Sequence, residues 1–166
     1  MNLGLVLKLL HVLAGFALVG GDIGRTIALR RAKQATDVKI VAEMMQLFTF
    51  LTTRFVSIGG AVTVVLGLIT AGIQGGPVLI LGFLLGGEIN WVLASLILYA
   101  VIMGIVFSVS VPRGKVLGQA LGAAMGQGKI TPELTAALND RAMNAAHIAV
   151  EILIVLIIIL MVLKPF

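Results

Sequence analysis

A lysine and a histidine interrupt an apolar run near the N-terminus, in the segment LKLLHVLAG that covers residues 7–15. Lys8 and His11 are three residues apart, so a helix places them on neighbouring turns of one face. A histidine in an apolar segment is a candidate metal ligand or proton carrier, and a lysine there is costly enough to be a candidate functional residue too. Asp22 and Arg25 continue the same face at helical spacing. The segment therefore predicts a polar stripe along an otherwise apolar helix.

Two later apolar segments also carry polar side chains. Ser95 and Tyr99 are one helical turn apart in the third of the apolar segments. In the last segment, the polar residues at helical spacing are Arg141, Asn144, His147 and Glu151. Polar groups are costly in the hydrocarbon of a bilayer, so each of them is a candidate functional residue.

Depth in the membrane sorts these side chains into two groups. Measured from the outer boundary, at about 1.5 Å per residue, His11 and Tyr99 lie about 12 Å deep and Glu151 about 19 Å deep. The outer group, which we expect to form one polar cluster, consists of Lys8, His11, Thr63, Ser95, Tyr99 and Glu151. The second group, at the cytoplasmic rim, consists of Asp22, Arg25, Arg54, Arg141 and Asn144.

The same estimate argues against a haem held between the two histidines. His11 and His147 differ by roughly 13 Å along the membrane normal. Two axial nitrogens flank one iron at about 4 Å from each other, given bonds of roughly 2 Å. His11 is therefore the better single ligand, and His147 is expected to be an interfacial histidine.

Each candidate residue has a structural interpretation as well as a functional one, and the sequence does not decide between the two. Lys8 is close enough to the outer surface for its ammonium group to reach the headgroups. His11 suits a hydrogen bond between helices as well as a ligand. The rim charges suit anchors of the bundle, whereas Glu151, nearest the middle of the bilayer, favours a functional or strongly paired role.

Four long apolar segments must position these side chains. The 166-residue chain is 60% hydrophobic and 11% charged, whereas soluble domains have about a quarter of charged residues. Each segment reaches the roughly 20 residues that span a hydrocarbon core of about 30 Å. We expect a single all-α domain over residues 1–166, a transmembrane four-helix bundle with spans at about 3–24, 55–73, 89–111 and 145–163. In the second span, glycines at 59, 60, 67 and 72 predict close helix packing.

The Lys and Arg residues of the connections predict the topology. The first and third connections are rich in them, and the second, residues 71–88, has none. Because these residues favour the cytoplasmic side, both termini are expected outside. Residues 36–54 predict an amphipathic cytoplasmic extension of the second span, and the apolar residues 77–87, too few to span, suit a turn in the outer interface or a cap over the bundle.

Composition also excludes several classes of function. Cysteine is absent, which rules out disulfides and thiolate metal sites. The basic residues gather at membrane edges, so nucleic acid is not an expected partner. The sequence has no Gly-rich phosphate loop in the required context and no Ser-His-Asp set. The lipid bilayer is the partner that the sequence predicts directly.

Several motifs together resemble a known family. They are LKLLHVLAG followed by GG, AVTVVLGLIT, a tryptophan and then VPR around the third span, and the ending LMVLKPF. The chain resembles, over nearly its whole length, the bacterial integral membrane proteins of domain-of-unknown-function family 2269. This resemblance implies a multi-pass protein of the bacterial inner membrane and assigns no activity.

A more distant similarity points to a cofactor. The HemJ-type protoporphyrinogen oxidases also have Lys-x-x-His in the first helix, matched by Lys8 and His11, and Arg-x-x-Asn before the fourth, matched by Arg141 and Asn144. The chain is similar in its first helix to CopD-type membrane proteins as well. The HemJ resemblance implies haem binding through His11 and leaves the oxidase activity itself open.

The leading functional hypothesis is an intramembrane redox protein that binds haem b or another porphyrin. His11 would be the metal ligand, Lys8 would neutralise a propionate or assist proton transfer, and Tyr99 and Glu151 would handle protons near the cofactor. The alternative is a non-catalytic membrane scaffold, or a small transporter acting as a homodimer, in which Glu151 and His11 form a proton-handling pair.

Overall fold

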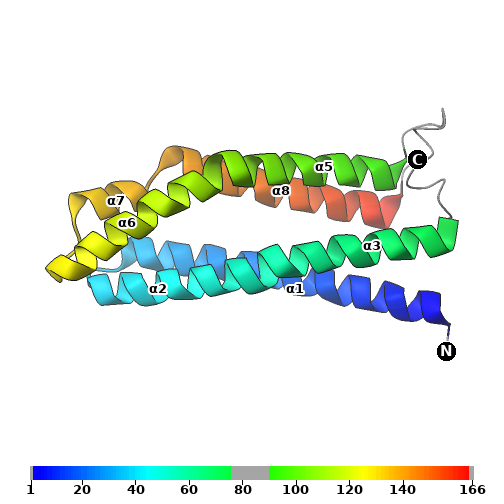
Figure 1. Cartoon of the computed structure of the whole chain (residues 1–166), viewed down its shortest axis with the longest axis horizontal. Coiled ribbons are helices and arrows are strands. Elements are labelled where there is room, and N and C mark those ends of the chain that lie inside the picture. The colour runs from blue at the N-terminus through cyan, green and yellow to red at the C-terminus, as the bar shows by residue number, and fades with distance from the viewer. Residues whose placement is uncertain (1, 76–89, 165–166) are drawn as a thin grey trace.

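The computed structural model describes residues 2–75 and 90–164, which form a bundle of long helices with no strand in these ranges. Four helical rods are long and apolar enough to cross a membrane. The all-α membrane bundle predicted from the sequence is therefore confirmed. The two termini lie at the same end of the bundle (Figure 1). The turn or cap expected at residues 77–87 lies outside the described residues.

Three of the four rods contain more than one helical element. In chain order the elements are α1 (Leu3–Gln34); α2 (Val38–Leu51), η1 (Thr52–Ile58) and α3 (Gly59–Gly75); α5 (Trp91–Ile105), η3 (Val106–Ser110) and α6 (Val111–Gln127); and α7 (Pro132–Leu138) with α8 (Arg141–Leu163). The elements η1 and η3 are π-helical stretches that join α-helices end to end. Pro112 is the second residue of α6, which follows η3, and a proline lacks the N–H that would continue the regular ladder.

Side-chain caps set where the helices begin. In each case an oxygen of the capping residue accepts a backbone N–H of the first turn, which satisfies a donor that has no partner within the helix. The capping residues are Asn2, Asp37, Asn90, Thr131 and Asp140. At the end of α6, Gly128 adopts a φ of 66°, a left-handed conformation that glycine takes without steric cost.

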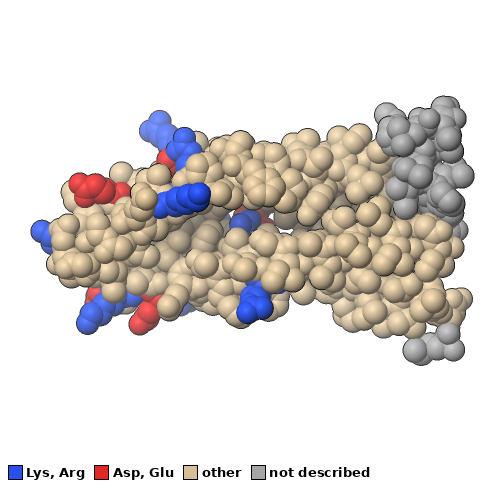
Figure 2. Space-filling view, viewed as in Figure 1, with Lys and Arg blue, Asp and Glu red and all other residues tan. Residues whose placement is uncertain are grey.

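The rods are arranged as two pairs (Figure 1). In one pair α1 packs along α2, η1 and α3, and in the other α8 packs along α5 and η3. Contacts of α6 with α2 and of α7 with α1 join the pairs at the end opposite the termini. Figure 2 shows most of the Lys, Arg, Asp and Glu side chains of this face at that end, which we call the charged end. The opposite end is called the termini end.

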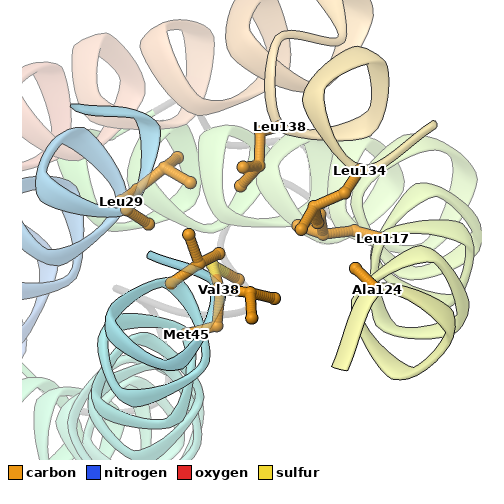
Figure 3. Close-up of a cluster of buried hydrophobic side chains, with 9 residues drawn as sticks. Leu29, Val38, Met45, Leu117, Ala124, Leu134 and Leu138 are labelled. Atoms are coloured by element: carbon orange, nitrogen blue, oxygen red, sulfur yellow. The ribbon is translucent and has the colours of Figure 1, made fainter. Parts of the chain in front are cut away.

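A buried hydrophobic cluster holds the charged end together. Side chains of α1, α2, α6 and α7 converge there, as Figure 3 shows. Val41 and Leu134 are fully buried in this cluster. In the spans, by contrast, many large apolar side chains lie on the surface of the chain. They face the bilayer, where lipid replaces a protein core.

Glycines let α1 approach the second rod closely. A Cβ on Gly21 would overlap the Phe55 side chain of η1, and one on Gly67 would lie 2.8 Å from the His11 ring. Gly60 meets Leu18 in the same way, at 3.1 Å. Small residues serve this purpose in membrane helices, because packing and not water drives their association.

Adjacent glycines allow a matched test of this contact. Gly21→Ala should lower the thermal stability of the detergent-purified protein, by about 1–3 kcal/mol, because the new methyl group displaces Phe55. Gly20→Ala, with no atom within 4 Å of the added Cβ, should leave stability unchanged or raise it by up to about 1 kcal/mol. Equal unfolding temperatures for the two variants would contradict the close contact between α1 and η1.

Candidate functional site

A buried ion pair lies on α1 where it faces the second helix pair. Arg25 Nη2 is 2.5 Å and Arg25 Nε 2.8 Å from Asp22 Oδ1. Both residues are only 7% exposed. The spacing of three residues puts both side chains on one face of the helix. A charge in this setting requires a partner, and the two residues neutralise each other.

Two hydrogen bonds cross from α1 to α8 on the same side. Thr26 Oγ1 donates to Glu151 Oε1 at 2.9 Å, and Lys33 Nζ donates to Asn144 Oδ1 at 2.7 Å. We call the residues that line this junction of α1 with α8 the polar seam: Asp22, Arg25, Thr26, Lys33, Asn144, His147 and Glu151. In Figure 2 the surface is hollowed between the two helix pairs, and charged side chains lie at the floor of the hollow.

His147 occupies the seam one turn from Glu151. Its ring stacks on Phe48 of α2, with centroids 5.9 Å apart and planes at 26°. The charges of Arg25, Asp22 and Lys33 act on this ring. The residue expected to lie at the interface is thus half-buried and packs against α2.

The seam runs from the hydrocarbon region toward the charged end. Glu151 lies twelve residues before the last residue of α8, about 18 Å along the helix and so within a core of about 30 Å. Lys33 is the second-last residue of α1, beyond the span expected at residues 3–24. Burial, followed by the charge of Arg30, lowers the pKa of Lys33. Its ammonium group donates to the Asn144 side chain and forms no ion pair with a carboxylate of the described residues.

Within the described parts of the chain, His11 and Thr63 are the only residues of the expected outer cluster that a hydrogen bond joins to each other. His11 Nδ1 is 2.9 Å from the backbone oxygen of Thr63. The hydroxyls of Thr63 and Ser95 bond to carbonyls of their own helices, and Lys8 is exposed. Tyr99 is half-buried on α5. Glu151 bonds to Thr26, so it belongs with residues that the sequence assigned to the cytoplasmic rim.

The two histidines lie at different levels, in agreement with the sequence estimate. His11 packs against Thr63 and Gly67, whereas His147 packs against Phe48. Phe48 and Thr63 are fifteen residues apart on one continuous rod, which corresponds to about 22 Å.

In the part of the chain that the structure describes, Arg113 forms an ion pair, whereas Arg54 and Arg141 do not. Arg54 and Arg141 are exposed and form no ion pair within the described residues. Arg113 pairs with Asp140, the residue that caps α8, and so ties η3 and α6 to that helix. The backbone N–H of Met143 is the main cause that lowers the pKa of Asp140, with Arg113 contributing.

Sequence reasoning missed Thr26 and Lys33 as members of the site. The available signal was spacing, because Asp22, Thr26 and Lys33 are four and seven residues apart and lie on one helical face. Their partners on α8 depend on how the two pairs dock. The periodicity of one helix does not show how two helix pairs dock, so it could not identify these partners.

Comparison with family models gives one assignment. The model described as "Predicted integral membrane protein (DUF2269)" matches residues 5–165. The chain belongs to this family. Comparisons with curated proteins and with solved structures give no match. The family description agrees with the four spanning helices, so this DUF2269 protein is a multi-pass membrane protein in contact with the lipid bilayer.

Loss of the Asp22–Arg25 ion pair should lower the stability of the protein more than loss of any other contact in the seam. Asp22→Asn leaves Arg25 without its counter-charge, and we expect a loss of about 3–5 kcal/mol in the free energy of unfolding. Thermal unfolding in detergent measures the change, with Glu43→Gln, an exposed acid of α2, as the control. The double variant Asp22→Asn/Arg25→Met should recover part of the loss. A wild-type melting curve for Asp22→Asn would refute the pairing.

Proposed function

We propose that this protein is a small proton-linked carrier in which Glu151 takes up and releases the proton. One observation carries the proposal. Glu151 lies within a membrane-spanning helix, half-buried, and has a neutral hydroxyl donor but no ion-pair partner among the described residues. Carboxylates within membrane spans mark proton relays and ion pathways.

The charges around Glu151 support this assignment. Asp22 and Arg25 neutralise each other on the α1 side of the seam. Within the described helices, further titratable groups on packed faces are His147 on α8, Tyr99 on α5 and, nearer the termini end, His11 on α1. The net charge of the seam in the hydrocarbon region therefore changes with the protonation of Glu151 and His147.

The arrangement of the helices supplies an element able to move. The pairs are packed together by apolar side chains at the charged end. Nearer the termini end, the α1–α8 junction includes the Thr26–Glu151 hydrogen bond. Protonation of Glu151 removes the negative charge that the Thr26 hydroxyl stabilises, and this weakens the junction. The two helix pairs then open about the charged end, which is a hinge motion of a known kind. The loop charges predict that the charged end faces the cytoplasm.

Proton flux in proteoliposomes tests the proposal. Vesicles that contain an enclosed pH-sensitive dye and purified protein are given a potassium diffusion potential. Wild-type protein should acidify or alkalinise the lumen faster than protein-free vesicles, and Glu151→Gln should abolish the difference. Glu43→Gln should behave as wild type. Flux that is unchanged in Glu151→Gln, or absent from wild type, would overturn the assignment.

A second candidate function, haem b binding at His11, is favoured by one hydrogen bond. A carbonyl oxygen only accepts, so the bond to Thr63 requires the proton on His11 Nδ1. Nε2 then has a free lone pair, which is the arrangement of a metal-ligating histidine whose other nitrogen is held by the backbone. Lys8 is exposed one turn nearer the termini end, a position that suits it to neutralise a haem propionate. Bound haem would supply one-electron redox chemistry, and His11 is the residue that would hold it.

The absorption spectrum of protein purified with haem supplied decides this second candidate. A Soret band at near-stoichiometric occupancy is expected, and His11→Ala should eliminate it because the only proposed ligand is lost. His147→Ala is the matched control and should keep the band. No chromophore in wild type, or an unchanged spectrum in His11→Ala, would exclude haem at this position.

A further inference from the structure

Arg54 lies where the second rod leaves the hydrocarbon core. It is part of η1 and precedes Gly75, the last residue of α3, by 21 residues. That length corresponds to about 30 Å along the rod, which is the thickness of the hydrocarbon core. The residues between Arg54 and Gly75 include no Asp, Glu, Lys or Arg. Arg54 is therefore placed at the depth of the lipid headgroups, on the side of the charged end.

The guanidinium group of Arg54 has no partner in the described parts of the chain. Its side chain is exposed, and no ion pair or hydrogen bond engages it there. Arg25 and Arg113, by contrast, each pair with an aspartate. The five N–H donors of a guanidinium group match the oxygens of a phosphate. An unpaired arginine at headgroup depth is therefore suited to bind a lipid phosphate.

Two hydroxyl groups next to Arg54 are also free to donate. Thr53 and Ser57 are exposed, and neither forms a hydrogen bond with the described residues. Ser57 is three residues from Arg54 and four from Thr53, so the three side chains are neighbours on the surface of the rod. We call Thr53, Arg54 and Ser57 the donor patch. The other hydroxyl side chains of this rod donate to backbone carbonyls one turn earlier, and they are Thr49, Thr52, Thr63 and Thr70.

An aliphatic stripe continues from the donor patch toward the termini end. At helical spacing from Arg54, the same face of the rod carries Ile58, Val62, Val65 and Ile69. Each of these side chains is between 44% and 48% exposed, except Val65 at 55%. Donors at headgroup depth and an exposed aliphatic stripe below them match the two parts of a phospholipid, its phosphate and its acyl chain.

The charge of the donor patch favours an anionic lipid over a zwitterionic one. The nearest acidic residue on the same rod is Glu43, eleven residues from Arg54. Asp22, on the adjoining α1, is buried and paired with Arg25. The positive charge of Arg54 is therefore not neutralised by these carboxylates, and a headgroup with a net negative charge compensates it.

We propose that the donor patch binds the headgroup of an anionic phospholipid from the leaflet at the charged end. Arg54 and the hydroxyls of Thr53 and Ser57 donate to the phosphate oxygens, and one acyl chain lies along the aliphatic stripe. The site contains no residue of the polar seam, so it does not depend on the proposed proton-linked function.

Native mass spectrometry of the detergent-purified full chain, titrated with phosphatidylglycerol, tests the inference. Wild type should hold a lipid adduct, and phosphatidylcholine, which has no net charge, should bind at least about fivefold more weakly. Arg54→Gln should weaken phosphatidylglycerol binding by about tenfold, because charge-assisted hydrogen bonds to the phosphate are lost. Lys39→Gln is the matched control, since it removes an equal charge from an exposed position of α2, and it should bind as wild type.

A double variant separates the donor patch from its charge. Thr53→Val/Ser57→Ala keeps Arg54 and should still weaken phosphatidylglycerol binding by about threefold or more. Glycerol phosphate, a headgroup without acyl chains, should not displace the lipid. Equal phosphatidylglycerol binding in wild type and either variant of the patch, an equal loss in Lys39→Gln, displacement by glycerol phosphate, or equal affinity for phosphatidylcholine would overturn the inference. A dimer in place of the lipid adduct, lost in Arg54→Gln, would assign this surface to a second copy of the chain and overturn it too.

Discussion

A polar group within a bilayer must find its partner inside the protein, because no water is present to replace it. This constraint explains the contacts between the two helix pairs. Asp22 and Arg25 neutralise each other on α1, and Glu151 accepts a hydrogen bond from Thr26 across the junction with α8. The polar seam therefore both joins the pairs and concentrates the side chains able to carry a proton.

The two ends of the bundle are held by different forces. At the charged end, burial of apolar side chains from four helices holds the pairs together, as in a soluble protein. In the spans, aliphatic side chains face lipid, and lipid offers no hydrophobic drive for the pairs to close. A fixed end and a junction held by hydrogen bonds make the α1–α8 seam the natural place for a change of conformation. The protonation state of Glu151 bears directly on that junction.

Much of the fold could be predicted, because apolar length is a local property of the chain. Four segments of sufficient length indicate the four rods without knowledge of any contact. The candidate site was less predictable. Depth placed Glu151 with His11 and Tyr99, yet its partner is Thr26, nearer the charged end. Helices of unequal length, α1 with 32 residues and α8 with 23, shift the register between neighbours, and sequence alone does not give that register.

The most direct measurement is the infrared difference spectrum of the membrane-reconstituted protein between acidic and alkaline pH. A carboxyl band of Glu151 should appear on acidification, disappear in Glu151→Gln, and move to higher frequency in Thr26→Val, which removes the hydrogen bond. That result would establish a proton-binding carboxyl at the α1–α8 junction. An identical difference spectrum in wild type and Glu151→Gln would contradict the account, because Glu151 would then not exchange its proton.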